Sequence, residues 1–503
     1  MTAAFARVPE LLASHLLLSF AALLLGLALA LPMILLAARH PAVARVALGF
    51  ASLVQTIPAL ALLALFFPLL LWLGLPPLGF LPSLLALSLY ALLPILRNGV
   101  TGLAGIDPAV REAADGVGMT ARQKLLWVEA PLVLPVLMAG IRTAAVWTIG
   151  AATLATTVGQ PSLGDLIFSG LQTQSWPLVL AGCIASAGLA LAVDALLGLA
   201  ERGVATRRRW LWMASLALLA VGAGAAALPR LSPARPTVVV GAKNFSEQFI
   251  LARLIGARLR DAGYDVAYRE GLGSAVAYGA LKTGTIDVYV DYAGTIWASE
   301  MKRAGAPSAA QMLPAIARWA KDTGGVRLLG PLGFENAYAF AMRADEARAA
   351  GIATLDDLAR ASPRLRLASD LEFLDRPEWA AVRRAYPMRF GEARAYAPSF
   401  MYQALASGRA DVISAFSSDG RIAADRLVVL SDPRGAIPRY DAILLLSPKR
   451  AGDTRFIDAL RPLLNAIPVA AMREANYLVD RDTDKRSPDD AARWLATRID
   501  RRP

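Results

Sequence analysis

The sequence predicts a multi-span α-helical membrane domain followed by a two-lobed α/β domain. Its 503 residues are 56% hydrophobic, which is too apolar for a wholly soluble protein of this length. Long Leu/Ala runs fill residues 1–228, whereas residues 237–503 hold most of the charge. In this second part, short β-branched segments alternate with amphipathic ones, as is typical of parallel α/β sheets. We therefore place a domain boundary near Pro229–Pro236.

Six segments of the first part are apolar enough to span about 30 Å of hydrocarbon. They are Leu11–Ala38, Val46–Leu73, Phe80–Leu103, Pro131–Val158, Pro177–Ala200 and Leu211–Leu228. Pro58 and Pro94 fall inside two of these segments. Each is expected to kink its helix, for packing or for a role in a pathway.

In the loops between the six segments, positive charges follow the first, third and fifth segments. They are Arg39, Arg45, Arg111, Arg122, Lys124, Arg202, Arg207, Arg208 and Arg209, while loops 74–79 and 159–176 carry no Lys or Arg. By the positive-inside rule the charged loops are cytoplasmic, and the sixth segment delivers the second half to the outer side. We expect 206–235 to be an uncleaved anchor and linker, although Arg207–Arg209 and Ala223–Ala227 also match a signal peptide.

Charged residues inside the spans are costly and call for partners. Arg97 lies near a cytoplasmic end and is expected to snorkel. Arg142 lies deeper, and we expect it to contact Glu129, Glu112 or a carbonyl, in a structural or a transport role. Asp194 poses the same question.

Several function classes are not expected. The net charge of +12 is scattered over the second half and over short loops, which does not favour nucleic-acid binding. Cys183 is the only cysteine and His15 and His40 are the only histidines, so the sequence predicts neither a disulfide nor a metal site. The usual nucleotide-binding and hydrolase motifs do not occur, so we expect neither a cofactor nor catalysis.

One cytoplasmic loop, 105–131, carries a motif. It reads Glu112-Ala113-Ala114-Asp115-Gly116-Val117-Gly118 and, nine residues later, Val128-Glu129-Ala130-Pro131. This resembles the EAA loop of ABC-importer permeases, although Ala130 stands where the family has a larger apolar residue. The resemblance implies a type I permease domain over 1–205 with five core spans. It also implies a homodimer and a cytoplasmic ATPase subunit that docks on Glu112, Ala113, Ala114 and Gly118.

The second part of the sequence is expected to form two lobes. The first covers about 236–340 and 441–503, and the second covers about 341–440. Predicted strands are Thr237–Val240, Asp265–Arg269, Asp287–Val290, Arg366–Ala368 and Asp411–Ser414, and predicted helices are Ser246–Ala262, Ala275–Thr283 and Ser399–Ser407. Two lobes joined by two crossings form a hinged cleft, and ligands bind such sheets at the carboxyl ends of strands.

Five strings mark this part. They are Gly241-Ala242-Lys243-Asn244-Phe245-Ser246-Glu247-Gln248, Tyr289-Val290-Asp291-Tyr292-Ala293-Gly294-Thr295, Phe334-Glu335-Asn336-Ala337-Tyr338, Asp411-Val412-Ile413-Ser414-Ala415-Phe416-Ser417-Ser418-Asp419-Gly420 and Ile437-Pro438-Arg439-Tyr440. Together they resemble the periplasmic binding proteins of the glycine betaine/choline/carnitine class of ABC importers. Permeases fused to such a domain occur in this family and include ergothioneine importers.

The resemblance implies a site. A quaternary ammonium has no N–H and is recognised by aromatic faces, which the resemblance places at Tyr292, Tyr338, Phe416 and Tyr440. Core packing is the alternative for these rings, and Phe416 replaces the tyrosine common in the family. The family pattern places Lys243, Thr295 and Arg376 around a ligand carboxylate.

Four further residues keep open alternatives. Glu372 is expected to accept an N–H from a ligand ring or to hold Arg376. Asp419 and Arg421 are further candidates for contact with the ligand. Arg421, two residues after Asp419, is expected to reach the same pocket or to lie at the surface, and we favour the surface. Gln248 is expected to support the site rather than to contact ligand.

The sequence thus predicts the permease and solute-binding component of an ATP-driven importer for a quaternary ammonium compound of the glycine betaine/choline/carnitine type. The alternative is ergothioneine or another small amino-acid-like solute. We expect a multi-pass protein of the bacterial inner membrane with its binding domain on the periplasmic or extracellular side.

Overall fold

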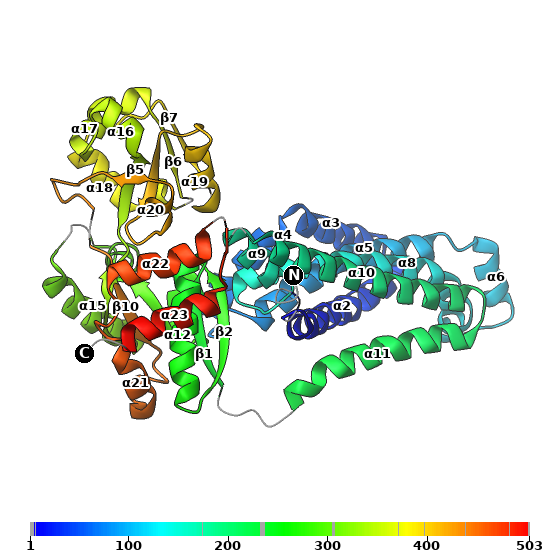
Figure 1. Cartoon of the computed structure of the whole chain (residues 1–503). Helices are drawn as coiled ribbons and strands as arrows, with labels where there is room; N and C mark the ends of the chain where they lie inside the picture. Colours follow the sequence, from blue (N-terminus) through cyan, green and yellow to red (C-terminus); the bar gives the residue numbers. More distant parts are fainter. Residues whose placement is uncertain are drawn as a thin grey trace. The chain divides into compact units, whose positions relative to one another are not determined.

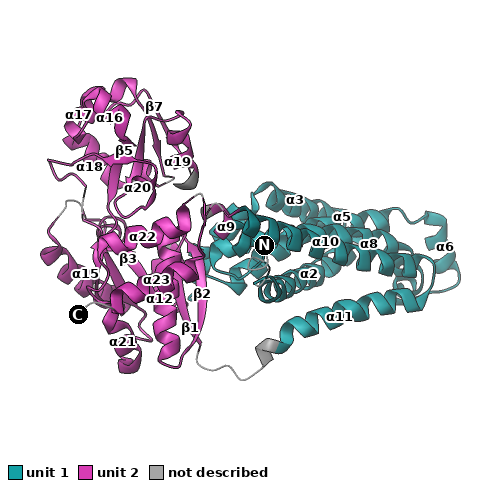
Figure 2. Ribbon diagram, viewed as in Figure 1, with its two compact units in different colours: residues 1–168, 176–234 teal, residues 169–175, 235–503 magenta. Residues whose placement is uncertain are grey.

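The computed structural model describes residues 5, 7–173, 175–231, 237–303, 307–370, 372–396, 398–437, 439–481 and 483–500. Residues 232–236 of the expected linker and Pro438 of the fifth string lie outside these ranges. The chain separates into two compact units, Met1–Phe168 with Trp176–Ala234 and Ser169–Ser175 with Arg235–Pro503 (Figure 2). Each unit is described by itself.

The first unit is helical. Its elements are α2 (Val8–Arg39), α3 (Pro41–Thr56), α4 (Ala59–Trp72), α5 (Phe80–Ala104), α6 (Pro108–Gly116), α7 (Ala121–Lys124), a π turn (Leu125–Glu129), α8 (Ala130–Ala152), a 3-10 turn (Thr153–Val158), α9 (Gly164–Gln172), α10 (Trp176–Ala205) and α11 (Arg209–Leu231) (Figure 1). Over the described residues, five helical segments are long and apolar enough to cross a membrane, or six if the bent pair α3–α4 counts as one.

The second predicted span, Val46–Leu73, is divided into α3 and α4 at the kink expected at Pro58. The chain bends by 101° between α3 and α4, where Ile57 is extended (φ −75°, ψ 125°) and Pro58 precedes α4. Proline disfavours the helical conformation in the residue before it and lacks an N–H to continue the ladder. Pro94, in contrast, lies inside an uninterrupted α5.

Helix α5 forms the centre of this unit and packs against α2 and α8. Glycines allow the close approach. A Cβ at Gly140 of α8 would lie 2.7 Å from the Pro94 carbonyl oxygen, and one at Gly99 would lie 2.3 Å from the side chain of Ile34. Small residues at such contacts are typical of helices that pack in membranes.

The second unit contains two five-stranded sheets. The first has the order β2-β1-β3-β10-β4 and the second β7-β6-β8-β5-β9. The strands are β1 (Thr237–Lys243), β2 (Asp265–Leu272), β3 (Val288–Tyr292), β4 (Arg327–Glu335), β5 (Tyr338–Arg343), β6 (Arg366–Ser369), β7 (Glu392–Ala395), β8 (Val412–Phe416), β9 (Leu427–Val429) and β10 (Asp441–Leu446). Both sheets are mixed rather than purely parallel, because β10 and β5 run antiparallel to their neighbours.

Each antiparallel strand lies next to a crossing between the lobes. Strand β5 follows the first crossing at Asn336 and Ala337, so the predicted boundary near residue 340 falls inside this strand. Strand β10 follows Tyr440 and returns the chain to the first sheet, antiparallel to β3 and β4. A strand that enters a sheet from the other lobe runs against the strands already there.

Helices cover both sheets. They are α12 (Ser246–Asp261), α13 (Ser274–Lys282), α14 (Ala293–Thr295), α15 (Ala309–Gly324), α16 (Ala344–Ala350), α17 (Leu355–Ala361), α18 (Pro377–Ala385), α19 (Pro398–Ala406), α20 (Arg421–Ala424), α21 (Thr454–Leu460), α22 (Val469–Asp480) and α23 (Pro488–Asp500). The last three return to the first lobe, where α22 and α23 pack on α12 (Figure 1).

Candidate ligand site

A cavity of about 740 Å³, open to solvent, lies between the two lobes of the second unit. All seven of the main predicted site residues line it, and Glu372 does so as well. The seven are Lys243, Tyr292, Thr295, Tyr338, Arg376, Phe416 and Tyr440. Side chains that are up to 197 residues apart in sequence, from Lys243 to Tyr440, therefore meet in one place.

The strand ends explain this convergence. Lys243, Tyr292 and Phe416 are the last residues of β1, β3 and β8, while Tyr338 begins β5 and Tyr440 precedes β10. Carboxyl ends of parallel strands meet at one edge of a sheet, and the edges of the two sheets face the same cleft.

Aromatic rings form the walls. The Tyr338 ring centroid lies 4.9 Å from that of Phe416 and 5.9 Å from that of Tyr440, to which it is perpendicular. Phe245, which the sequence analysis did not single out, lies 6.1 Å from both Tyr292 and Phe416. Tyr292, Tyr338 and Tyr440 are buried members of the hydrophobic core of this unit, and they also line the cavity, where ring faces can contact a cation.

Arg376 supplies the positive charge. Its Nη2 donates to Glu372 Oε2 at 2.5 Å, and its guanidinium lies 5.6 Å from the centre of the Tyr338 ring. Its Nε and Nη1 are buried and donate no hydrogen bond to any residue that the structure describes, although Nη1 lies 3.8 Å from a Glu378 oxygen. Glu372 thus holds Arg376, and two nitrogens remain for a carboxylate.

Lys243 is less free than the family pattern implies. Its ammonium forms a buried ion pair with Asp291, which also accepts a hydrogen bond of 2.5 Å from the Tyr289 hydroxyl. The ammonium lies 5.4 Å from the centre of the Tyr292 ring. Lys243 lines the cavity, but its positive charge is already balanced by Asp291.

Asp370 is a cavity residue that the sequence analysis missed. Its Oδ1 accepts hydrogen bonds from the backbone N–H groups of Glu372 (2.8 Å) and Phe373 (3.0 Å). Its Oδ2 is buried and has no hydrogen-bond partner within the described residues, and burial raises the pKa of this carboxyl. A carboxylate directly after strand β6 was the signal that could have found it.

Buried carboxyl groups position the rings. The Tyr292 hydroxyl donates to Glu247 Oε1 at 2.5 Å and accepts from Gln248 Nε2 at 3.0 Å. The Tyr440 hydroxyl donates to Glu378. Gln248 therefore supports Tyr292, in the role expected for it, and burial raises the pKa of Glu247.

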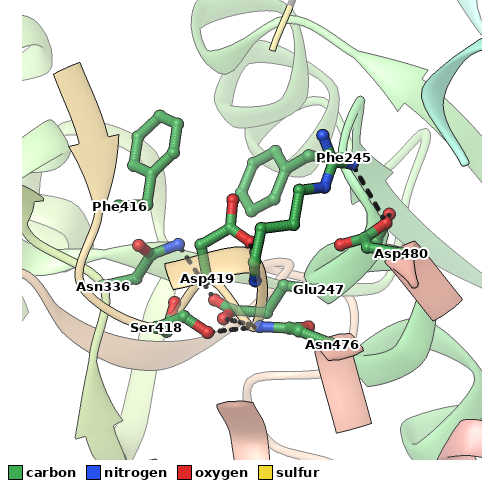
Figure 3. A pocket seen from close by; sticks show the side chains of 10 residues that line it. Phe245, Glu247, Asn336, Phe416, Ser418, Asp419, Asn476 and Asp480 are labelled. Carbon is green, nitrogen blue, oxygen red and sulfur yellow. Dashed lines mark hydrogen bonds and ion pairs between the residues drawn. The ribbon is translucent and has the colours of Figure 1, made fainter. Parts of the chain in front are cut away.

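Asp419 and Arg421 line a second, smaller cavity of about 440 Å³, shown in Figure 3. The expectation that Arg421 lies at the surface is wrong, because its side chain is 10% exposed and pairs with Asp480 at 3.4 Å. Helix α20 begins at Arg421 and packs against α22, which carries Asp480. The two cavities share Phe245, Asn336 and Phe416.

The motif of loop 105–131 forms two short helical segments joined by a turn. Glu112, Ala113 and Ala114 lie in α6, and Gly118 adopts a left-handed φ of 78° before α7. Arg111 of α6 pairs with Glu129 of the π turn after α7 at 3.2 Å, and Lys124 of α7 pairs with Asp115 of α6 at 2.6 Å. Glu112 and Ala113 are exposed, whereas Ala114 is buried.

Arg142 has other partners than those expected. It binds Asp194 through Nε and Nη2, both at 3.0 Å, and Glu201 through Nη1 at 2.7 Å. Glu129 is instead paired with Arg111. Asp194 and Glu201 lie seven residues apart on α10, so they share one helix face.

Residues 236–497 match the substrate-binding domain of ABC-type glycine betaine transport systems, and residues 13–206 match the inner membrane component of binding-protein-dependent transport systems. The chain belongs to this glycine betaine transport family. It is an importer permease fused to its binding domain, a membrane protein made of transporter components rather than an enzyme. Such a permease implies a partner ATPase and a small-molecule ligand.

Relatives match both halves. The chain is 26% identical over 468 residues to the ergothioneine transport permease/ergothioneine binding protein EgtU of Helicobacter pylori (strain G27), covering 89% of this chain and 82% of the relative. It is 45% identical over 187 residues to the carnitine transport permease protein OpuCB of Listeria monocytogenes, covering 37% of this chain and 83% of the relative. It is 40% identical over 190 residues to the glycine betaine/carnitine/choline transport system permease protein OpuCB of Bacillus subtilis (strain 168), covering 38% of this chain and 85% of the relative.

Proposed function

We propose that this transporter imports a quaternary ammonium compound of the glycine betaine/choline/carnitine type. The carrying observation is that Tyr292, Tyr338, Phe416 and Tyr440 share one cavity with Arg376, whose guanidinium keeps two nitrogens without hydrogen bonds. Relatives named for carnitine, choline and glycine betaine transport support it.

The chemistry divides the ligand into two ends. The trimethylammonium lies among the rings, where each good cation–π contact contributes about 0.5–2 kcal/mol. The carboxylate accepts a charge-assisted hydrogen bond from one of the two unused nitrogens of Arg376, Nε or Nη1. Lys243 and Thr295 line the same cavity and complete the carboxylate end. A primary ammonium would need several acceptors in place of the rings, which disfavours an ordinary amino acid.

A second candidate is a betaine that also carries a ring N–H, such as ergothioneine. Asp370 favours it, because this residue lines the cavity and its buried Oδ2 has no hydrogen-bond partner among the described residues. Glycine betaine has no N–H to offer this oxygen, whereas an imidazole-type ring does. The relative named for ergothioneine transport matches across both halves of the chain.

In this proposal two copies of the chain form the permease, and a separate cytoplasmic ATPase docks on Glu112, Ala113, Ala114 and Gly118. The binding domain lies on the outer side of the inner membrane, closes on solute and delivers it to the permease. Co-purification of an ATPase subunit, its loss after Gly118→Trp, and protease access to the binding domain from outside intact spheroplasts test these parts.

Calorimetric titration of the purified full chain tests the ligand. Glycine betaine, choline, carnitine, ergothioneine and unmethylated glycine are compared on the native protein, on Tyr440→Ala and on Tyr268→Ala, which lies outside the cavity. We expect one methylated compound to bind at micromolar or lower Kd, glycine not to bind, and only Tyr440→Ala to abolish binding. A folded protein that binds none of the methylated compounds contradicts the proposal.

A further inference from the structure

The permease unit holds one charge cluster within its spans that the ligand site and the loop 105–131 do not use. We name it the α8–α10 cluster, and it consists of Arg142, Asp194 and Glu201. Arg142 lies 12 residues after the start of α8 at Ala130, and Asp194 lies 11 residues before the end of α10 at Ala205. At 1.5 Å per residue, both are roughly 16–18 Å from those helix ends. Asp194 lies six residues before Ala200, where the fifth apolar segment ends, and Glu201 directly follows that segment.

A glycine shapes the cluster. Gly198 lies four residues after Asp194 and three before Glu201, on the same face of α10. A Cβ at Gly198 would lie 3.2 Å from Cζ of Arg142. Without that Cβ, the guanidinium lies flat against the helix and reaches both carboxylates at once.

The cluster carries surplus charge and is partly uncovered. One guanidinium faces two carboxylates, which leaves a formal charge of −1. Within this chain, the side chains of Arg142, Asp194 and Glu201 are 33%, 35% and 26% exposed. An ionised side chain within the hydrocarbon is costly unless it is paired or reaches water, so the cluster itself is unsuited to contact with acyl chains.

A tightly packed second copy is also disfavoured. A twofold interface centred on this face would bring two clusters of the same charge together, and like charges brought together at an interface cost several kcal/mol. Water between the copies removes both penalties. Two negative clusters on either side of a water-filled route would also attract a cationic head group, as acidic rings do in cation pathways.

We propose that the α8–α10 cluster lines the water-filled route of the solute, where its surplus negative charge interacts with the quaternary ammonium. The identity of the solute rests on the proposed function, whereas the position of this face in water does not. The cluster acts as a weak cation-selective step rather than as a storage site, because Arg142 already engages both carboxylates.

The only cysteine is a natural reporter for this idea. Cys183 precedes Asp194 by 11 residues on α10, which places it within about 20° of the same helix face, and it is exposed. Charged thiosulfonate reagents react with thiols in water and not with thiols in lipid. The full chain in lipid nanodiscs is labelled with a trimethylammonium reagent and with a sulfonate reagent of similar size, without any solute or ATPase.

We expect Cys183 to react with both, and a cysteine one turn from the cluster, Ala190→Cys in a Cys183→Ser background, to prefer the cationic reagent by about tenfold. Asp194→Asn or Glu201→Gln should reduce this preference to about threefold or less. The control is Leu218→Cys on α11, where Leu218 is 59% exposed on an apolar face. It should react with neither charged reagent.

Each other outcome overturns the proposal. Labelling of Cys183 and Ala190→Cys only by a membrane-permeant maleimide places the face in lipid. Disulfide-linked dimers that resist both charged reagents place it in a packed interface. An unchanged preference in both charge variants removes the role of the cluster. Failure of the calorimetric titration, with a positive labelling result, overturns only the identity of the solute.

Discussion

Two arginines of this chain, one in each unit, bind carboxylates in different ways. Arg142 in the membrane unit donates hydrogen bonds to Asp194 and Glu201 through all three of its nitrogens. Arg376 in the ligand cavity donates only through Nη2, to Glu372, and its Nε and Nη1 have no hydrogen-bond partner within the described residues.

This difference separates a group that holds the structure from a group that awaits a ligand. Buried donors in folded proteins are almost always satisfied, so a buried guanidinium with unused nitrogens marks a place where another molecule completes the set. A fully engaged guanidinium fixes its neighbours, and its removal leaves charges without partners. The two arginines should therefore respond oppositely in assays of affinity and of stability.

The largest expected effect is on ligand affinity in Arg376→Ala. Loss of a charged hydrogen-bonding partner should weaken glycine betaine or carnitine binding by about 3 kcal/mol, roughly 100-fold. The affinity for choline, which has no carboxylate, should fall by less than tenfold. Calorimetry measures both, and Arg383→Ala, an exposed arginine of the same lobe that is absent from the cavity, is the control. Equal losses for carnitine and choline would contradict the assignment of Arg376 to the carboxylate.

Arg142→Ala should instead lower stability and leave affinity unchanged. It strands two carboxylates in a span, and because the three side chains are about one-third exposed we expect a loss of roughly 1–2 kcal/mol, below that of a fully buried pair. The measurement is thermal unfolding of the full chain in detergent, followed by titration with ligand. The control is Arg142→Lys, which keeps the positive charge and should lose less stability than Arg142→Ala. A tenfold change in ligand affinity would break the distinction between the two arginines.

Asp370→Asn sharpens the comparison on the acceptor side. The variant replaces a free carboxylate oxygen by an amide and should weaken a ligand with a ring N–H, such as ergothioneine, by about 1.5 kcal/mol, or roughly tenfold. The affinity of the same variant for glycine betaine should change by less than threefold. The reverse order of effects would remove the reason for the second candidate.

The same carboxyl predicts a pH dependence. Burial raises the pKa of Asp370, so the group takes up a proton at a higher pH than an exposed aspartate, whose pKa is about 3.9. The ionised form accepts the ligand N–H, so affinity for ergothioneine should be constant well above this raised pKa and fall as the pH drops through it. Titrations from pH 8 down to 4.5 measure the trend, which should vanish in Asp370→Asn.

The sequence predicted the site better than its surroundings. The family resemblance singled out Tyr292, Tyr338 and Phe416, and the structure brings these three strand-end residues to one cavity, because the ends of neighbouring strands meet at one edge of a sheet. The sequence could not show that Asp291 forms an ion pair with Lys243 or that Asp480 forms one with Arg421. These partners come from distant segments, and their packing leaves no local sequence pattern.

The fold shows the same division. Hydropathy and length predicted the apolar segments, and the kink expected at Pro58 is a 101° bend between two helices. A proline in the sequence predicts a kink, but the angle of the kink depends on the helices that pack around that position. The sheets were predicted as parallel, and the antiparallel β5 and β10 arise only because the chain crosses between the lobes.

The smallest effect is expected for Phe416→Tyr, which restores the hydroxyl common in the family. The π-face is retained, so the affinity for a quaternary ammonium should change by less than about 0.5 kcal/mol, or roughly twofold. The new hydroxyl would lie close to Tyr338, whose ring centroid is 4.9 Å from that of Phe416. Its effect should therefore differ between carnitine and glycine betaine only if the larger ligand reaches this wall. Titration of both ligands decides the point: a loss of tenfold or more for either one shows that the cavity uses Phe416 to exclude a polar group rather than only to offer a ring face.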